Sequence, residues 1–480
     1  MNEPRALSHY VGGQWVAAAP SFDSLNPSDT RDIVARVPAD DGEIMGAAVR
    51  AAKGAFPEWA DTTPEVRSDL LDRIGSTILA RKEELGRLLS REEGKTLPEG
   101  IGEVARAGRI YKFFAGEALR RRGATVDSTR PGIEVATYRE PVGVFGLITP
   151  WNFPIAIPAW KSAPALAFGN TVVMKPASLT PALAVALAEI VHEAGVPRGV
   201  FNLVLGGGAA GDALTANKDV AGLSFTGSQS VGARVTAAAM TRQARVQLEM
   251  GGKNPLVVLD DCDLDRAVLC ALDGAYFATG QRCTASSRII VTQGMHDRFV
   301  DALTKRVQAL RVGDALAPET QMGPLASQAQ LDTTLSYLDI AVKEGGARRA
   351  GGERLSLATP GYYVSPALIV DTKPDMRINC EEVFGPVASV VRVRDYEEAL
   401  GAANAGEFGL SAGIVTSSLK YARHFARNVR AGMVMTNLPT AGVDYHVPFG
   451  GSRKSSYGAR EQGFAAIEFY TQIKTTYSWA

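Results

Sequence analysis

The strongest constraint on the fold is an alternation of short apolar runs with helical stretches that begins at Val142. Apolar runs such as Val142–Ile148 and Thr171–Lys175 alternate with helix-favouring segments such as Pro181–Gly195. A second series of the same kind follows from Pro255. Such alternation favours a parallel sheet with helices on both of its faces. The sequence therefore predicts an α/β protein with two such units.

The rest of the chain adds a helical region and two outlying segments. Leucines and isoleucines recur at spacings of three and four between Thr63 and Leu89, which predicts amphipathic helix. The segments Gly123–Arg139 and Phe469–Ser478 are rich in β-favouring residues, yet by position they belong to neither α/β series. We expect them to pair with each other as an outlying flap. A chain of 480 residues has room for about three such units.

The charge balance argues against a nucleic-acid or membrane partner. The chain holds 51 Lys and Arg against 51 Asp and Glu, so no net field draws it to nucleic acid or anionic lipid. The segment from Met1 to Trp15 lacks the apolar core of a signal peptide, and apolar runs elsewhere stop short of membrane-spanning length. We therefore expect a cytoplasmic protein that acts on a small molecule.

The four cysteines have to be judged one by one. Cys262, Cys270, Cys283 and Cys380 lack the spacing of a zinc site and are too sparse for a disulfide framework, so no metal is expected. The first two flank a helix that belongs in the core. Cys283 lies among small and polar residues in GQRCTASS, which suits a reactive thiol, although a lone cysteine is more often a small buried hydrophobe.

Three loops stand out for their density of glycine, proline and polar residues beside apolar strands. They are TPWNFP at Thr149–Pro154, LEMGGKNP at Leu248–Pro255 and EEVFGP at Glu381–Pro386. Loops that follow strands are where α/β proteins bind ligands. We expect these loops to form one site with Cys283.

Together with PFGG at Pro448–Gly451, these motifs resemble the aldehyde dehydrogenase superfamily. Members of that family carry WNFP, ELGGK, GQxC, EEFGP-type and PFGG segments in this order, and the resemblance extends from Tyr10 to Tyr477. It implies an α/β fold with a Rossmann-like cofactor domain, an α/β catalytic domain and a small β flap that makes a homodimer or homotetramer. The implied boundaries are 1–122 with 140–251, then 252–449, and 123–139 with 464–480 for the flap.

The resemblance assigns three catalytic residues. The Cys283 thiolate would attack an aldehyde carbonyl, and the Asn152 side chain with the Cys283 backbone N–H would hold the resulting oxyanion. Glu249 would act as general base in hydrolysis of the thioester. From the residues alone, Asn152 can equally be a turn former and Glu249 a partner in an ion pair. Met250 replaces a leucine of the family motif, which should not affect the carboxylate.

The resemblance also implies NADP or NAD as cofactor. The helix after Phe225–Ser228 would direct its N-terminus at the pyrophosphate. The glycine loop Gly206–Gly211 is one residue shorter than the common family form and does not match the usual dinucleotide fingerprint. Lys175 would reach the adenosine ribose, and Glu382 the nicotinamide ribose. The full set of expected cofactor contacts is Trp151, Lys175, Ser178, Gly208, Gly227, Ser228, Glu382 and Phe384.

Ser178 bears on the choice between the two cofactors. Relatives that prefer NAD often have a glutamate here, which binds the ribose 2′-hydroxyl and would repel a 2′-phosphate. A serine beside Lys175 can accept that phosphate. The sequence therefore predicts appreciable use of NADP.

The substrate is indicated by fewer residues. Arg282 precedes the nucleophile, where a cation could anchor an anionic tail or serve the structure alone. The segments Gly108–Arg120 and Val443–Gly463 (VDYHVPFGG and SSYGAREQG) resemble the branch that oxidises 2-oxoglutarate semialdehyde (2,5-dioxopentanoate). Arg109 and His446 are candidate second contacts. Succinate semialdehyde and broad aliphatic aldehydes are the alternatives.

Other classes of function remain to be weighed. A thiol hydrolase or esterase with Cys283 and His446 would have no use for Asn152, Glu249 and Glu382 in these loops. A CoA-acylating enzyme typically lacks the general base, so Glu249 favours hydrolysis. A purely structural role is disfavoured because nucleophile, base and oxyanion donor are all present.

Overall fold

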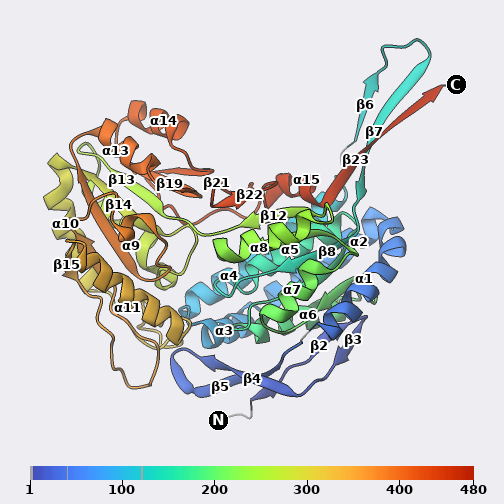
Figure 1. The fold of residues 1–480 in the computed structure, drawn as a ribbon, viewed down its shortest axis with the longest axis horizontal. Helices are drawn as coiled ribbons and strands as arrows, with labels where there is room; N and C mark the ends of the chain where they lie inside the picture. Colours follow the sequence, from blue (N-terminus) through green and yellow to red (C-terminus); the bar gives the residue numbers. More distant parts are fainter. Residues whose placement is uncertain (1–3, 41, 121–122, 480) are drawn as a thin grey trace.

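Two mostly parallel sheets organise the chain in the computed structural model, which describes residues 4–40, 42–120 and 123–479 (Figure 1). In the first sheet, five central strands run parallel, and β22, β2 and β3 add antiparallel edges. From edge to edge its strands are β22 (Ser456–Tyr457), β12 (Arg245–Glu249), β11 (Val220–Thr226), β8 (Val144–Ile148), β9 (Thr171–Lys175), β10 (Phe201–Leu203), β2 (His9–Val11) and β3 (Gln14–Val16).

Helices cover both faces of this sheet, as the alternating sequence predicted. Side chains along β8 alternate between two cores: Phe145 and Leu147 face one, and Val144 and Ile148 face the other. The first core is completed by α2 (Pro64–Ala80), α3 (Lys82–Glu93), α4 (Leu97–Ala118), α5 (Ala156–Ala167) and α6 (Pro181–Glu193). The second core is completed by α1 (Glu43–Asp61), α7 (Gly208–Ala216) and α8 (Gln229–Met240).

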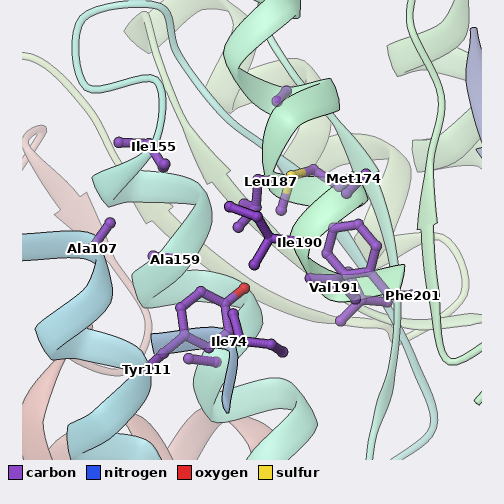
Figure 2. Packing of buried hydrophobic residues seen from close by; sticks show 14 of the residues in the cluster. Ile74, Ala107, Tyr111, Ile155, Ala159, Met174, Leu187, Ile190, Val191 and Phe201 are labelled. Carbon is purple, nitrogen blue, oxygen red and sulfur yellow. The ribbon is translucent and has the colours of Figure 1, made fainter. Parts of the chain in front are cut away.

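The predicted amphipathic region consists of two helices. The hydroxyl of Thr63 caps α2 by accepting from the Val66 amide, and Arg81 lies between the end of α2 at Ala80 and the start of α3 at Lys82. The next helix, α4, packs its small and aromatic side chains on α5, and Figure 2 shows Ala107 and Tyr111 facing that contact. The Tyr111 hydroxyl lies 2.7 Å from Ser162 Oγ, which fixes the rotation of α4 against α5.

The second sheet has seven strands, of which only β15 at one edge runs antiparallel. The strands follow the order β15 (Ala347–Ala350), β16 (Ala367–Val370), β17 (Val387–Val393), β14 (Ser286–Thr292), β13 (Asn254–Val258), β19 (Ser411–Val415) and β20 (Met433–Thr436). Its helices are α9 (Leu264–Tyr276), α10 (Gln293–Gln308), α11 (Gln328–Lys343), α12 (Arg377–Cys380), α13 (Tyr396–Asn404) and α14 (Leu419–Asn428). The strands β13 and β19 are buried along their whole length, as expected for a sheet covered on both faces.

The two outlying β segments pair with each other, as their composition predicted. The strand β23 (Thr471–Trp479) runs antiparallel to β7 (Ile133–Pro141) over nine residue pairs, and β6 (Ala124–Asp127) lies on the other side of β7. Figure 1 shows this sheet projecting from the body of the molecule. A separate N-terminal sheet contains β1 (Arg5–Ala6), β4 (Pro20–Asn26) and β5 (Asp29–Pro38).

The chain returns to the first unit after residue 449, which the expected boundaries did not anticipate. The strand β22 pairs with β12, and α15 (Ile467–Tyr470) precedes the flap strand. The rings of Phe469 and Tyr470 lie 5.2 and 4.8 Å from the ring of Phe145 on β8. These aromatic residues favour strands by composition, but burial against the first sheet places them in its core rather than in the flap.

Within the described ranges, no helix combines the length and the apolar character needed to cross a membrane.

Candidate active site

The order of the strands in the first sheet identifies a crevice. From β8, the chain builds outward through β9 and β10 on one side and through β11 and β12 on the other. The carboxyl ends of β8 and β11 therefore border the point where the strand order reverses, which is where open α/β sheets bind ligands. The loop Thr149–Pro154 follows β8, and Gly227 and Ser228 follow β11.

A cavity of about 230 Å³ lies at this crevice, with the second unit supplying its other wall. Many of the predicted site residues are brought together here from segments that are far apart in sequence. The lining residues are Pro150, Trp151, Asn152, Ile157, Thr226, Gly227, Ser228, Met250, Gly251, Cys283, Gln330, Glu382 and Phe384.

Cys283 differs from the other three cysteines in its surroundings. Burial raises the pKa of its thiol well above the ordinary range, and the charges of Glu382 and Glu249 raise it further. All of these causes favour the neutral thiol over the thiolate. Cys270 lies in the core of the second unit, and Cys380 is exposed away from the cavity.

The backbone of Cys283 is held by a residue that the sequence did not single out. The Asn254 amide donates to the carbonyl oxygens of Cys283 at 2.7 Å and Ala285 at 2.9 Å. Just upstream, Ala278 and Thr279 have positive φ angles of 50° and 56°, a strained turn that such cross-links must maintain. Asn254 belongs to the KNP segment, where an asparagine before a proline also fits an ordinary turn, so this contact could not be predicted from the neighbouring residues.

Asn152 is buried with its side chain next to the segment that carries Cys283. Its Nδ2 donates to the Gln281 carbonyl at 3.0 Å, which occupies one of the two amide hydrogens and leaves the other for a ligand. The main-chain carbonyl of Asn152 accepts from Lys95 Nζ, and Lys95 Nζ also lies 3.0 Å from Glu103 Oε2. The second oxygen of Glu103 accepts from the amides of Ile155 and Ala156. This buried ion pair therefore fixes the loop that carries Asn152.

Glu249 ends β12 between β11 and β22. Its Oε2 accepts from Ser456 Oγ at 2.5 Å, and its side chain does not line the cavity. Burial raises the pKa of Glu249 well above its usual range, and the nearby charge of Glu461 raises it further. Both causes favour the protonated carboxyl group, and in this conformation the side chain is bonded to Ser456 rather than directed into the cavity.

Glu382 depends on the two glycines that follow Met250. Its Oε1 accepts from the Gly252 amide at 2.9 Å, and a Cβ on Gly251 would lie 2.0 Å from its Oε2. Burial raises the pKa of Glu382 to about 7. The GG pair in LEMGGK therefore makes room for a carboxylate that comes from the other unit.

The loop after Glu382 is also fixed by cross-links. Phe384 has a φ of 59°, and its ring meets that of Trp151 edge to face at 5.4 Å. Gln330 Nε2 donates to the carbonyls of Val383 and Phe384 at 2.9 Å each. Gln330 lines the cavity too, yet in the sequence it is one polar residue near the start of a helix, without any feature that would single it out.

Lys175 and Ser178 lie together at the carboxyl end of β9. Lys175 Nζ donates to the carbonyls of Pro176 at 2.9 Å and Gly206 at 3.2 Å, and Ser178 Oγ donates to the same Gly206 oxygen at 3.2 Å. Burial lowers the pKa of Lys175 to about 8. Gly208 begins α7 beside them, and Ser228 is the residue before α8, so two helix N-termini face this end of the sheet.

The three predicted substrate contacts are not brought together. The Arg282 guanidinium donates to the carbonyls of Asp273 and Gly274 at the end of α9 and does not line the cavity of Cys283. Arg109 on α4 and His446 are exposed. The arginine on α4 that is directed inward is Arg106, one turn earlier, which sequence reasoning missed because helical phase cannot be read to a single residue.

This chain is similar to known proteins along nearly its whole length. The family model described as "Aldehyde dehydrogenase family" matches residues 15–476. An alpha-ketoglutaric semialdehyde dehydrogenase of Bacillus subtilis is 42% identical over 99% of both chains. An alpha-ketoglutarate semialdehyde dehydrogenase of Haloferax volcanii is 43% identical over 98% of both. The crystal structure of a betaine aldehyde dehydrogenase of Staphylococcus aureus with NAD+ is 34% identical, with a TM-score of 0.96, over 98% of this chain and 95% of that chain.

Proposed function

Since this chain belongs to the aldehyde dehydrogenase family, we propose that it oxidises a short carboxylated semialdehyde, such as 2-oxoglutarate semialdehyde, to the acid with NADP+ or NAD+. The similar semialdehyde dehydrogenases of Bacillus and Haloferax support this substrate class. Succinate semialdehyde is the nearest alternative. The observation that carries the proposal is the presence of Cys283 and the Asn152 amide in one cavity at the reversal point of the first sheet.

The residues around the cavity fit a nicotinamide dinucleotide. Gly227 and Ser228 place the N-terminus of α8 at the crevice, where backbone amides suit a pyrophosphate. Lys175 is buried and bonded only to main-chain carbonyls among the described residues, so one ammonium hydrogen remains for a ribose or its 2′-phosphate. Glu382 would hold the second ribose, with Trp151 and Phe384 beside it. When bound, the oxidised cofactor would accept a hydride from the aldehyde carbon.

The protein's own residues perform the acyl chemistry. The sulfur of Cys283 forms a bond to the aldehyde carbon after its proton has passed to solvent water, and the carbonyl oxygen takes up negative charge as its π bond to carbon breaks. The second amide hydrogen of Asn152 and the Cys283 backbone N–H donate to that oxygen. Loss of hydride from the tetrahedral carbon leaves a thioester on Cys283.

Glu249 then completes the turnover. Once it has turned from Ser456 towards Cys283 and ionised, its carboxylate accepts a proton from water as the water attacks the thioester carbon. The carbon–sulfur bond breaks, the thiol is restored and the carboxylic acid is released. Its raised pKa means that the base form gains population as pH rises.

The proposal is tested with purified protein, both cofactors and a panel of C4 to C6 aldehydes, by following absorbance of the reduced cofactor. We expect turnover with at least one carboxylated semialdehyde and loss of about 10⁴-fold or more in the Cys283→Ala variant. Reduction of the cofactor at the parent's rate by this variant would refute the role of Cys283. A thiol hydrolase would instead cleave esters without consuming cofactor.

We also propose a homodimer or homotetramer assembled through the flap. The outer edge of β23 has no strand partner among the described residues, and Ile473, Tyr477 and Trp479 on it are 60%, 62% and 82% exposed. An apolar edge of this kind is suited to another chain's strand.

The four free cysteines support a reducing compartment, which agrees with a cytoplasmic location.

A further inference from the structure

Arg106 on α4 has a guanidinium that none of the roles above uses. It donates to the Val443 carbonyl and, at 3.1 Å, to Gln462 Oε1, and it lies over the ring of Trp160 at 5.8 Å from the ring centre. Its Nε is buried and has no hydrogen-bond partner in the part of the chain that the structure describes. Leaving a buried N–H of a cation without an acceptor costs free energy. This group is therefore suited to donate a hydrogen bond to a ligand.

Arg106 lies near the nucleophile but outside the cavity described above. Burial lowers its pKa, and the groups whose charges act on it are Glu103, Asp444 and Cys283. A guanidinium stays protonated despite such a shift. Arg106 does not line the cavity bounded by Gly227 and Ser228. One turn before it on α4, Glu103 accepts from the amides of Ile155 and Ala156, which directly follow the loop that carries Asn152. A substrate whose carbonyl oxygen is held by Asn152 can therefore extend its tail towards this part of α4.

The residues next to Arg106 are held in place by contacts of their own. Trp160 Nε1 donates to Glu461 at 2.6 Å, and the Trp160 ring lies 5.4 Å from that of Phe449. On α4 itself, the next residue, Ala107, is fully buried in the core shown in Figure 2. The guanidinium is therefore fixed from both sides, as a binding group has to be.

We propose that Arg106 binds the distal carboxylate of the aldehyde substrate, and this inference rests on the function proposed above. In 2-oxoglutarate semialdehyde, four carbon–carbon bonds separate the aldehyde carbon from that carboxylate, a span of about 5 Å when extended. The free Nε and the remaining hydrogens of the guanidinium can donate two parallel bonds to a carboxylate. Arg282 cannot do this in the present conformation because its guanidinium caps carbonyls of α9.

The test compares succinate semialdehyde with butanal, which has the same number of carbons but no charge. In the Arg106→Met variant, which keeps the length of the side chain, we expect kcat/KM to fall roughly 10- to 100-fold for succinate semialdehyde, mainly through KM. For butanal the change should be less than about threefold. Arg106→Lys should recover part of the lost preference because it restores the charge without the planar pair of donors.

Two further variants act as controls. Lys112→Met removes another cation of α4, one that pairs with Asp72 at 2.7 Å on the surface, and should leave the ratio of the two kcat/KM values unchanged. Arg109→Met should do the same. A loss of preference in Arg109→Met that is absent from Arg106→Met would overturn the proposal in favour of the exposed arginine.

The outcomes separate the anchor from the function itself. A merely structural role of Arg106, through its bond to Val443, would lower the melting temperature and slow both aldehydes alike, so an unchanged ratio overturns the proposal. If the parent protein oxidises butanal but no carboxylated semialdehyde, the proposed substrate class fails. If the parent prefers the charged substrates and Arg106→Met keeps that preference, the class stands and Arg106 is not its anchor.

Discussion

At the scale of single residues, the ionisation of Cys283 follows from what surrounds it. Burial and the carboxylates of Glu382 and Glu249 all disfavour the thiolate, so its pKa lies above the usual thiol range. A raised pKa lowers the thiolate fraction at neutral pH, and only the thiolate reacts with alkylating agents. Without cofactor, alkylation of Cys283 by iodoacetamide should therefore be slow at pH 7 and rise roughly tenfold per pH unit up to pH 9.

Peptide-resolved mass spectrometry measures this rate for each cysteine in the same sample. Glu382→Gln, which removes the charge that contributes most after burial, should speed alkylation of Cys283 and leave that of the distant Cys262 unchanged. A rate that is already constant between pH 7 and pH 9 would contradict the raised pKa.

Ser178 gives a second prediction at this scale. Its hydroxyl and Lys175 both bond to the Gly206 carbonyl, so a group at position 178 lies beside the lysine. In Ser178→Glu, the carboxylate should repel a 2′-phosphate and accept the 2′-hydroxyl of NAD+ instead. We expect kcat/KM for NADP+ to fall about tenfold or more, with NAD+ little affected. Initial rates with both cofactors at saturating aldehyde provide the measurement, and an unchanged ratio would count against this location of the ribose.

At the scale of elements, the turn after β12 couples the two units. A methyl group at position 251 would collide with Glu382 Oε2, so Gly251→Ala should expel that carboxylate and break its bond from Gly252. We expect KM for the cofactor to rise about tenfold or more, because a hydrogen bond to a charged group is worth roughly 1.5–3 kcal/mol.

Gly401→Ala is a matched control, since Gly401 belongs to α13 and nothing lies within 4 Å of a Cβ at this position. It should leave KM unchanged and raise stability by up to ~1 kcal/mol; equal effects of both variants on KM would refute the collision.

At the scale of the whole molecule, the flap offers the edge for assembly. Replacing both Ile473 and Tyr477 by Lys puts charge on the exposed edge strand while the nine pairs with β7 remain. We expect the mass measured by light scattering to fall from the oligomer towards the monomer, with the circular dichroism of the two α/β units retained. A variant that keeps the parent's mass would show that another surface makes the assembly. Thr475→Lys, at an exposed polar position of the same strand, tests whether added charge alone is enough.

Much of this could be predicted from local patterns. Alternating apolar and helical segments indicated two covered parallel sheets, because the period of a side-chain pattern is a local property of the chain. The same patterns failed at Phe469 and Tyr470, whose aromatic rings suit a strand and a core equally well. Cys283, Asn152 and Glu382 were singled out because their motifs are unusual in composition, and all three line the cavity. Lys95, Asn254 and Gln330 were missed because nothing in their neighbouring residues marks them.

The sequence by itself determined which side chains are available for chemistry, and that the loops bearing them follow strands. Only the tertiary structure decided which of those side chains meet. Arg109 and Arg106 are equivalent cations on one helix until the packing of Ala107 and Tyr111 against α5 sets the rotation of α4, which leaves Arg109 in solvent and turns the half-buried Arg106 inward. Likewise, the pKa of Glu249 depends on Glu461 and Ser456, some two hundred residues away in sequence, and electrostatic interaction depends on distance in space.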